Sequence, residues 1–550
     1  MNLKLSPSSM RVIVVALFAA ATAMAGLWSL PPLDRDEARF AQATTQMLES
    51  GDYIAIQFQD RERNKKPAGI YWLQAASVNA FSTVEAREIW AYRIPSMIGI
   101  IIAAICTTLA GMKLYDERTG FLAGLFLASA PLVAAEGTIA KTDGVLLALT
   151  CLAQLAFLHI YARVQTNQFG SWRWPLAFWI AQGAAILIKG PIAPLVSLLT
   201  GVGLLAGPKR FAWIWPMRPI IGTIILLLMI VPWALAIWHA TDGRFFTEAI
   251  GRDMLGKVGS VQEGHAGLPG YHLLLLSFLF WPAAALIISG VTRTWRERRN
   301  WQARFLLAWL IPAWVVFELA STKLPHYVMP LYPALAIMAA HAATKMGTVK
   351  WPEKIGALIY CAIGLVAASL VALLPIIFSE AAMTGICFGV SATIALATIF
   401  VTMLFWRSKA YQGSIAATAL ASLYAWTLMT VVLPSLSDLA VSPRISIALE
   451  LADRHPIHNN TAPVAIAGYS EPSTVFLLGT ETALTTPSYA ASLLRNGDVS
   501  AAIIDRSHDQ EFKVALGETN VNTLAVIDGL NYSNGDKVTL TIYVRSPDIR

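Results

Sequence analysis

Acidic and basic side chains gather in one hydrophilic stretch near the start of the chain. Asp34, Asp36 and Glu37 open this stretch, and Lys65 and Lys66 lie near its end. Long apolar runs flank it on both sides. Charged groups at the boundary of a bilayer commonly mark a substrate path or a lipid-headgroup site. We therefore expect the chemistry of the chain in this loop.

The composition indicates a membrane protein with many spans. Of the 550 residues, 56% are hydrophobic and only 14% are charged, whereas soluble domains carry about 25% charged residues. The net charge of +7 does not indicate nucleic-acid binding, because the basic residues fall in short loops between apolar runs. The four cysteines lie inside apolar segments without metal-ligand spacing, so they predict neither a metal site nor a disulfide: Cys106, Cys151, Cys361 and Cys387.

Thirteen apolar segments are candidates for membrane spans, since a span needs about 20 apolar residues. If the N-terminus is inside the cell, every predicted inside loop is basic, as the positive-inside rule requires. The first apolar run has no convincing cleavage site, so we expect it to be an uncleaved first span. The candidate segments are 10–29, 92–112, 121–139, 144–162, 175–189, 190–207, 219–239, 271–291, 305–320, 328–344, 355–377, 386–406 and 414–434.

This topology predicts two domains. Residues 1–434 form an α-helical integral membrane domain of about thirteen transmembrane helices, with exterior loops at 30–91 and 240–270. Residues 435–550 lose the membrane character, and short strand-like runs alternate there with helical stretches. That alternation predicts a small α/β domain on the exterior side.

The first exterior loop is expected to hold two interfacial helices, one acidic and one basic at its start, with a charged cleft between them. Helical spacing follows Asp36, and a second amphipathic stretch runs from Gly69 to Phe81. The simpler interpretation is a pair of surface helices, in which acidic residues in the first turn are favoured by the helix dipole. It does not explain Arg39 on the same short helix.

Several motifs in the first 340 residues resemble a known family. DEARFA, SGDY and KKPAGIYWLQA in the first loop, then AYRIPSM (91–97), KTDGVLLA (141–148), IKGP (188–191) and KLPHYVMPLYPALAIM (323–338), are similar to lipid-linked-sugar glycosyltransferases of the GT-C fold. The resemblance is greatest to the aminoarabinose (4-amino-4-deoxy-L-arabinose) lipid A transferase family. Tyr53 and Ala68 depart from the family pattern, which usually has Trp and a second Pro at these positions.

The resemblance implies an inverting pentosyltransferase in the bacterial inner membrane with its active site facing the periplasm. It implies transfer of aminoarabinose from undecaprenyl phosphate to a phosphate of lipid A, a lipopolysaccharide modification that confers resistance to polymyxin. The implied partners are the donor lipid, lipid A and membrane lipids, without nucleic acid.

The same resemblance implies which side chains bind the donor phosphate. Lys66 and Arg39, with Lys65 beside them, suit phosphate oxygens at headgroup depth. Arg252 matches an Arg in the second exterior loop of the family. The alternative is that Arg252 is a solvated loop charge without a role in binding. Tyr327 of the KLPHY motif could donate a hydroxyl, or could serve only as an interfacial aromatic anchor.

Asp36 is the main candidate for the catalytic acid, with Asp143, Asp34 and Glu37 as further candidates. An acceptor phosphate is already anionic, so a general base is not required. Asp36 could orient the acceptor or stabilise positive charge at the anomeric carbon. It could instead pair with the ammonium of an amino sugar. Asp143 could equally be the N-cap of the next span.

The reaction implied by the resemblance requires no cofactor. A divalent metal, zinc or magnesium, is a further candidate for the site. Its candidate ligands are His265 and Glu263 in a Gly-rich exterior loop and Glu88 before the second span, but their spacing matches no metal motif. Two rival functions stay open. A protein O-mannosyltransferase-like enzyme would need Asp36 as a base, and a lipid-linked-sugar transporter would need charges deep in its spans.

Overall fold

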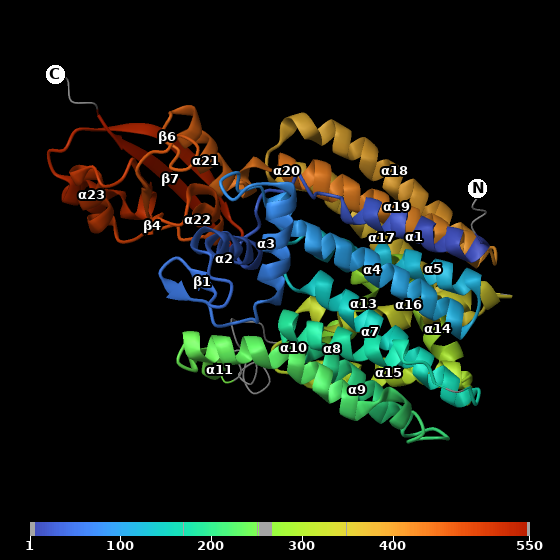
Figure 1. Cartoon of the computed structure of the whole chain (residues 1–550). Helices are drawn as coiled ribbons and strands as arrows, with labels where there is room; N and C mark the ends of the chain where they lie inside the picture. The colour runs from blue at the N-terminus through green and yellow to red at the C-terminus, as the bar shows by residue number, and fades with distance from the viewer. Residues whose placement is uncertain (1–5, 169, 250, 252–266, 348, 547–550) are drawn as a thin grey trace, which may run out of the picture.

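The computed structural model describes residues 6–168, 170–249, 251, 267–347 and 349–546 (Figure 1). A bundle of long helices makes up most of the chain. Its helices are α1 (Pro7–Ala23), α4 (Ile89–Leu114), α5 (Glu117–Ala128), α6 (Pro131–Gly137), α7 (Asp143–Gln165), α8 (Arg173–Lys189), α9 (Ile192–Leu204), η1 (Trp215–Met217), α10 (Pro219–Ala240), α11 (Arg244–Phe246), α13 (Tyr271–Leu279), η3 (Trp281–Ala283), α14 (Ala284–Arg296), α15 (Trp301–Leu319), η4 (Pro325–Leu331), α16 (Tyr332–Lys345), α17 (Trp351–Ile377), α18 (Ala381–Trp406), α19 (Ala410–Trp426), η5 (Thr427–Val432) and α20 (Leu433–Ser435).

Each of the thirteen predicted segments contains helix, but fewer helices than that are long enough to cross a membrane. Within the described residues, seven helices meet the length and hydropathy that a span needs, or nine if each of two bent pairs is one span. The chain is thus a multi-pass helical membrane protein. The figure of thirteen stays a prediction, because α1, α9 and α16 are shorter than a full span.

Two segments predicted as single straight spans are bent. The segment 121–139 is divided into α5 and α6, which meet at 64°, and the segment 271–291 turns by 87° between α13 and the helix after it. Pro131 begins α6, and Pro282 lies in η3 at the second bend. Proline removes a backbone donor and restricts the residue before it, so a helix commonly ends or bends there. The division between the predicted segments 175–189 and 190–207 is confirmed, since α8 ends at Lys189 and α9 begins at Ile192.

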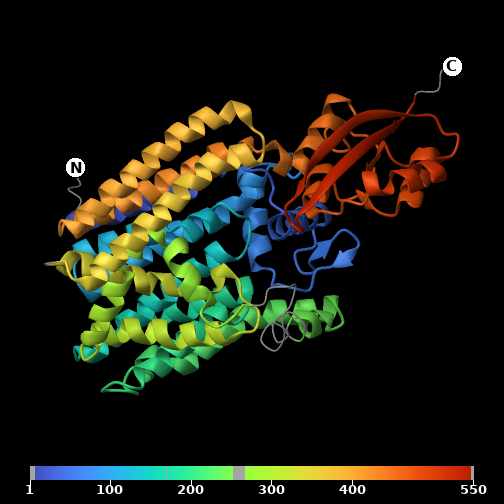
Figure 2. The ribbon, with the colours of Figure 1, turned by 180° about the vertical axis from the view of Figure 1, so that it is seen from behind.

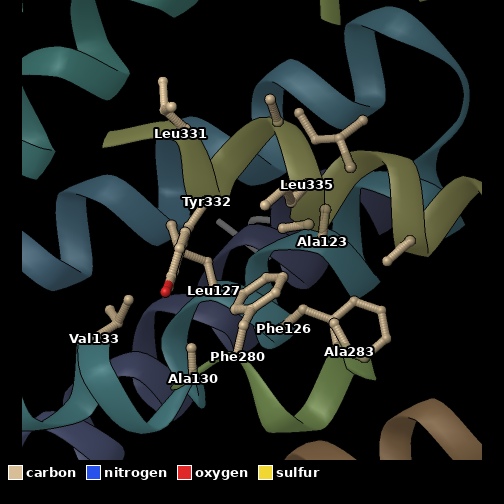
Figure 3. Close-up of a cluster of buried hydrophobic side chains, with 14 of the residues drawn as sticks. Ala123, Phe126, Leu127, Ala130, Val133, Phe280, Ala283, Leu331, Tyr332 and Leu335 are labelled. Carbon is tan, nitrogen blue, oxygen red and sulfur yellow. The ribbon is translucent and has the colours of Figure 1, made fainter. Parts of the chain in front are cut away.

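Aromatic and aliphatic side chains fill the centre of the bundle. Phe126 of α5 and Tyr332 of α16 point into the same cluster as Phe280, which precedes η3 (Figure 3). The rings of Phe280 and Tyr332 lie 4.9 Å apart between centroids. This packing holds the bend at Phe280 against α5 and α16.

The two ends of the chain lie at opposite ends of the bundle (Figures 1 and 2). The N-terminus lies at one end, and the β-sheet formed by strands between residues 464 and 545 lies beyond the other.

The last part of the chain, residues 441–546, is called the C-terminal domain below. Its five-stranded sheet has the order β4-β3-β5-β7-β6, in which β4, β3 and β5 are parallel and β7 and β6 antiparallel. The predicted strand and helix segments of this region are all present. The elements, with the preceding η6 (Ser437–Leu439), are α21 (Val441–Leu451), β3 (Val464–Ala467), α22 (Pro472–Leu478), β4 (Ala483–Leu484), α23 (Pro487–Asn496), β5 (Ala501–Asp505), η7 (Arg506–His508), α24 (Asp509–Leu516), β6 (Val521–Asn531) and β7 (Asp536–Arg545).

The first exterior loop joins the bundle to the C-terminal domain. It contains α2 (Asp36–Ser50), a two-stranded hairpin of β1 (Gln57–Phe58) and β2 (Arg61–Glu62), and α3 (Gly69–Phe81). Helix α2 lies between the bundle and the C-terminal domain (Figure 1). Most of α2 is therefore buried, including polar residues such as Gln42 and Thr44. The two predicted helices exist, but α2 is covered on both sides.

One close helix crossing sets the position of the candidate site. A Cβ added to Gly99 of α4 would lie 2.5 Å from the carbonyl oxygen of Gly144 in α7, and one added to Gly144 would meet the backbone of Ser96. Only glycine allows this approach. The contact brings the start of α7, where Asp143 lies, directly against α4.

Candidate functional site

The first turn of α2 presents two acids to different surroundings. Asp36 is exposed, and it accepts no hydrogen bond from the residues that the structure describes, whereas the next residue, Glu37, is buried. Successive helical residues point in directions about 100° apart. The helix therefore turns one carboxylate toward the solvent-facing side and the other into the protein.

Glu37 is held in a buried ion pair. Arg93 of α4 donates two hydrogen bonds of 2.8 Å to the two carboxylate oxygens of Glu37. The backbone N–H groups of Ala140 and Leu33 donate to the same carboxylate at 2.7 and 2.8 Å. The rest of the Arg93 guanidinium is satisfied by backbone carbonyls, including that of Leu30 at 2.9 Å. Glu37 thus fastens the start of α2 to α4 and to the turn between α6 and α7.

That turn contributes to a second cluster of charged side chains. Lys141 donates to Glu136 at 2.9 Å, and Lys189 of α8 donates to Asp143 at 2.7 Å. The imidazole of His326 lies between the two acids, 3.9 Å from Glu136 and 3.8 Å from Asp143. Both carboxylates are buried. Their charges are balanced by two lysines, as burial of ionised groups requires.

The electrostatics connect this cluster with Asp36. Burial alone would lower the pKa of Lys141, but the negative charges of Glu136, Asp143 and Asp36 outweigh burial and keep that pKa above its ordinary value. Burial raises the pKa of Tyr71, and the charge of Asp36 raises it further, against the opposing effect of Arg63. Asp36 therefore lies within electrostatic range of both a partly buried ammonium and a buried phenol.

The side chains predicted to bind phosphate come from α2, from the residues before α3 and from η4. Arg39 lies one helical turn after Asp36 and is half-buried, as is Lys66 just before α3, whereas Lys65 is exposed. Tyr327 follows His326 in η4, with 5.2 Å between the ring centroids. Each of these four side chains makes contacts of its own within the protein. Arg252 lies outside the described residues.

Asp34, the first acid of the loop, contacts the C-terminal domain. Its carboxylate accepts hydrogen bonds of 2.8 Å from the backbone N–H and from the hydroxyl of Ser473. Burial raises the pKa of Asp34 to about 6, although the bonds from Ser473 lower it. This carboxylate is thus engaged in joining two parts of the chain.

Of the candidate metal ligands, only Glu88 is described. It is exposed and accepts a hydrogen bond of 2.7 Å from Ser82. His265 and Glu263 lie outside the described residues. In the part of the chain that the structure describes, no three His, Cys, Asp or Glu side chains gather as metal ligands.

Two members of the buried cluster, His326 and Glu136, carry little signal in the sequence. His326 stands in the KLPHY motif beside Tyr327, and that position was its only signal. Glu136 lies in a predicted span, where an ionisable residue is a functional candidate by default. Its Oε2 atom is buried without a hydrogen-bond partner in the described structure.

Comparisons with known proteins agree with the resemblance seen in the sequence. Residues 13–241 match the family described as dolichyl-phosphate-mannose-protein mannosyltransferase. The chain is 27% identical over 330 residues to the undecaprenyl phosphate-alpha-4-amino-4-deoxy-L-arabinose arabinosyl transferase of Pseudomonas aeruginosa (strain LESB58), covering 58% of each protein. It is also 27% identical over 344 residues to the protein of the same name from Erwinia tasmaniensis, covering 60% of this chain and 59% of that protein. The matched part spans less than two thirds of these relatives.

Solved structures extend the likeness to the whole fold. The crystal structure of ArnT from Cupriavidus metallidurans bound to undecaprenyl phosphate superposes with a TM-score of 0.76 at 19% identity, covering 96% of this chain and 97% of that one. The Archaeoglobus fulgidus oligosaccharyltransferase gives a TM-score of 0.52 at 12% identity, covering 100% of this chain and 75% of that one. The chain therefore has the GT-C fold of these membrane transferases.

Proposed function

We propose that the chain is an inverting glycosyltransferase that moves 4-amino-4-deoxy-L-arabinose from undecaprenyl phosphate to a phosphate of lipid A. The names of the relatives and the donor lipid in the ArnT structure support this substrate pair. We propose further that it acts at the periplasmic face of the inner membrane. The basic residues of the loops that the positive-inside rule assigns to the cytoplasm support this orientation.

One observation carries the proposal. Asp36 presents an exposed carboxylate at the outer end of the helix bundle, beside a buried cluster in which Lys141 and Lys189 balance Glu136 and Asp143. A rigid charged cluster under a solvent-facing acid is suited to stabilising charge that develops during a reaction, since its groups need no reorganisation.

The donor phosphate would be held by the cations next to Asp36. Lys66 and Arg39, with Lys65 nearby, supply positive charge at the level where α2 and α3 begin, and the Tyr327 hydroxyl adds a donor. We propose Arg252 as a further phosphate partner. Charge-assisted hydrogen bonds from such groups hold the phosphate and stabilise the negative charge that it gains as the leaving group.

Bond changes then follow in one displacement. An anionic oxygen of the acceptor phosphate attacks the anomeric carbon, on the side opposite the polyprenyl phosphate. The bond from that carbon to the donor oxygen breaks, and its electron pair stays on the leaving phosphate. No proton needs to move. Asp36 stabilises the positive charge that develops at the anomeric carbon, or it binds the ammonium of the sugar.

The other acids have supporting roles in this proposal. Asp143 holds Lys189 at the start of α7. Glu37 holds the start of α2, and Asp34 holds the backbone before α2 against the C-terminal domain. The reaction needs no cofactor for its bond changes. Assay after chelation of zinc and magnesium tests whether a divalent metal contributes through Glu88, Glu263 and His265.

A second candidate function is transfer to a protein hydroxyl. The family match of residues 13–241 favours it. The exposed Asp36 also favours it, because a hydroxyl acceptor needs a base. Both candidates need the Asp36 carboxylate in its ionised form, as a base for a hydroxyl or as a counter-charge for a phosphate acceptor, so both lose rate as Asp36 becomes protonated. The product separates them: a glycosylated protein for the hydroxyl acceptor, a glycosylated lipid A phosphate for the other.

The test of the proposal is mass spectrometry of lipid A. The chain is expressed in a polymyxin-sensitive host that lacks its own aminoarabinose transferase but makes the donor lipid. Lipid A should gain one aminopentose per modified phosphate with the wild-type chain and none with an empty vector. Unmodified lipid A together with glycosylated envelope proteins would reject the proposal in favour of the second candidate.

A further inference from the structure

A short helix of the C-terminal domain is held at its N-terminal end by the loop that carries Asp36. The N-cap residue of α22 makes no side-chain capping bond of its own. Asp34 supplies the cap instead, because its carboxylate accepts from both the N–H and the hydroxyl of Ser473 at 2.8 Å. A carboxylate at a helix N-terminus satisfies free N–H groups and complements the helix dipole.

The backbone next to Asp36 is held as well. The Asp34 N–H donates to the hydroxyl of Tyr532 at 2.7 Å. Arg35 lies 3.6 Å from the buried carboxylate of Glu471, which also accepts a hydrogen bond of 2.8 Å from Asn531. Both residues that precede Asp36 are thus in contact with the C-terminal domain.

The Ser473 hydroxyl belongs to a buried chain of polar groups that fixes its direction. It lies 2.6 Å from the hydroxyl of Ser442 in α21, which lies 3.2 Å from that of Tyr469. All three side chains are almost fully buried. A buried hydroxyl whose partners are fixed is a rigid donor.

The other end of α22 is held independently, by residues of α2, of α4 and of the segment before α4. Arg87 donates to the carbonyl of Phe476 at 3.0 Å, and the Phe476 ring packs edge-on against Tyr92 at 5.3 Å between centroids. Beyond the helix, Thr480 accepts from Gln42 at 2.8 Å. These contacts lie away from Asp36. The interface therefore offers one set of bonds next to the candidate catalytic acid and another that only joins the two domains.

We propose that the C-terminal domain is a positioning element for Asp36, and that Ser473 and Tyr532 are positioning residues which act through Asp34. The inference rests on the proposed function for its effect on catalysis. Asp34 is tied to the C-terminal domain, and Glu37 is tied to Arg93 and Ala140. Asp36 stands between these two anchors, so its backbone is held on both sides, although its carboxylate accepts no hydrogen bond from the described residues.

The experiment compares the turnover of two variants with controls in the same domain. Tyr532→Phe removes the hydroxyl that accepts from the Asp34 N–H, and the tyrosine ring is exposed. Ser473→Ala removes one of the donors to the Asp34 carboxylate. Both should lower kcat by roughly tenfold to a hundredfold and leave the KM for the donor lipid within about twofold, because misplacement of a reacting group affects turnover. Tyr489→Phe, an exposed tyrosine without a side-chain bond in the described structure, should match the wild type.

Hydrogen–deuterium exchange supplies a readout that does not depend on activity. Amides of residues 33–39 should exchange faster in Tyr532→Phe and Ser473→Ala, because the backbone before α2 loses its anchors. They should exchange at the wild-type rate in Tyr489→Phe and in Thr480→Val, which weakens only the distant contacts.

The two arms separate the inference from the proposed function. If the wild-type chain transfers no sugar but the exchange pattern is as expected, the proposed function fails and the positioning by the C-terminal domain stands. If the wild type is active while Tyr532→Phe and Ser473→Ala keep wild-type kcat and exchange, the inference is overturned. It is also overturned if Thr480→Val lowers kcat as much as they do, since general docking would then explain the effect.

Discussion

The carboxylate of Glu37 and the guanidinium of Arg93 face each other with two hydrogen bonds of 2.8 Å, and neither side chain reaches solvent. The pair joins the first exterior loop to α4. Glu37 also binds the N–H of Ala140, the residue before Lys141. One buried pair therefore sets both the helix that begins with Asp36 and the turn that presents the lysine.

Glu37→Gln should destabilise the protein strongly. The change leaves the buried Arg93 charge uncompensated, which costs about 3–5 kcal/mol. Thermal unfolding of the detergent-solubilised protein measures the loss. Glu62→Gln is the matched control, because the Glu62–Arg244 pair at 2.8 Å is largely exposed on the arginine side and such pairs contribute about 0–1 kcal/mol. Equal unfolding temperatures for the two variants would contradict this assignment.

Lys66→Ala should weaken donor binding and abolish transfer without unfolding the chain. The loss of a charge-assisted contact to phosphate costs about 1.5–3 kcal/mol, and more where water is excluded. Binding of undecaprenyl phosphate to the purified variant measures the first effect. The control is Lys537→Ala, at an exposed lysine of β7 in the C-terminal domain. Normal donor binding by Lys66→Ala would place the phosphate elsewhere.

The junction with the C-terminal domain should depend on pH through Asp34. Burial raises the pKa of Asp34 from an ordinary value of 3.8 to about 6, and Glu471 adds to the rise while Ser473 and Arg39 oppose it. The folded state thus binds this proton more tightly than the unfolded state does. The resulting stabilisation is fully present below pH 3.8 and is lost as the pH rises through about 6.

Asp34→Asn should remove that dependence. The asparagine keeps an oxygen for the Ser473 N–H but carries no charge at any pH. Relative to the variant, the wild type should lose up to about 3 kcal/mol of stability between pH 4 and pH 7. The difference between the two thermal unfolding profiles measures this loss. Parallel profiles over that range would show that the Asp34 carboxyl does not titrate abnormally.

The C-terminal domain should lie outside the cytoplasm. A cysteine introduced by Asn496→Cys, at the end of α23, should react with a membrane-impermeant maleimide in intact spheroplasts. Lys409→Cys, between α18 and α19, should react only after lysis. The reverse pattern would mean that the proposed orientation is wrong.

Hydropathy predicted the helical segments well, because a membrane span must be apolar along its whole length. The strands of the C-terminal domain were also predictable, since apolar runs such as Ile503-Ile504 stand between polar turns. The two sharp bends were not predicted. They depend on packing around Pro131 and Pro282, which the mean hydropathy of a window does not register.

The site was predictable in its location but not in its division of roles. Asp34, Asp36 and Glu37 look alike in sequence, and only the fold shows that the first contacts the C-terminal domain, the second is exposed and the third is buried. Glu136 and His326 meet through contacts between residues far apart in the chain. No local pattern reports such a contact, so neither residue was expected in the cluster.

The central claim is that Asp36 acts in the transition state of sugar transfer, and a reconstituted assay with Asp36→Asn tests it most directly. Purified protein is mixed with undecaprenyl-phosphate aminoarabinose and lipid A, and donor binding and product formation are both measured. Asp60→Asn, at an exposed acid of the same loop, is the control. We predict that Asp36→Asn binds the donor as the wild type does and loses at least about a hundredfold in kcat, while Asp60→Asn is unchanged. A folded Asp36→Asn protein that turns over within a few-fold of the wild type would contradict the account.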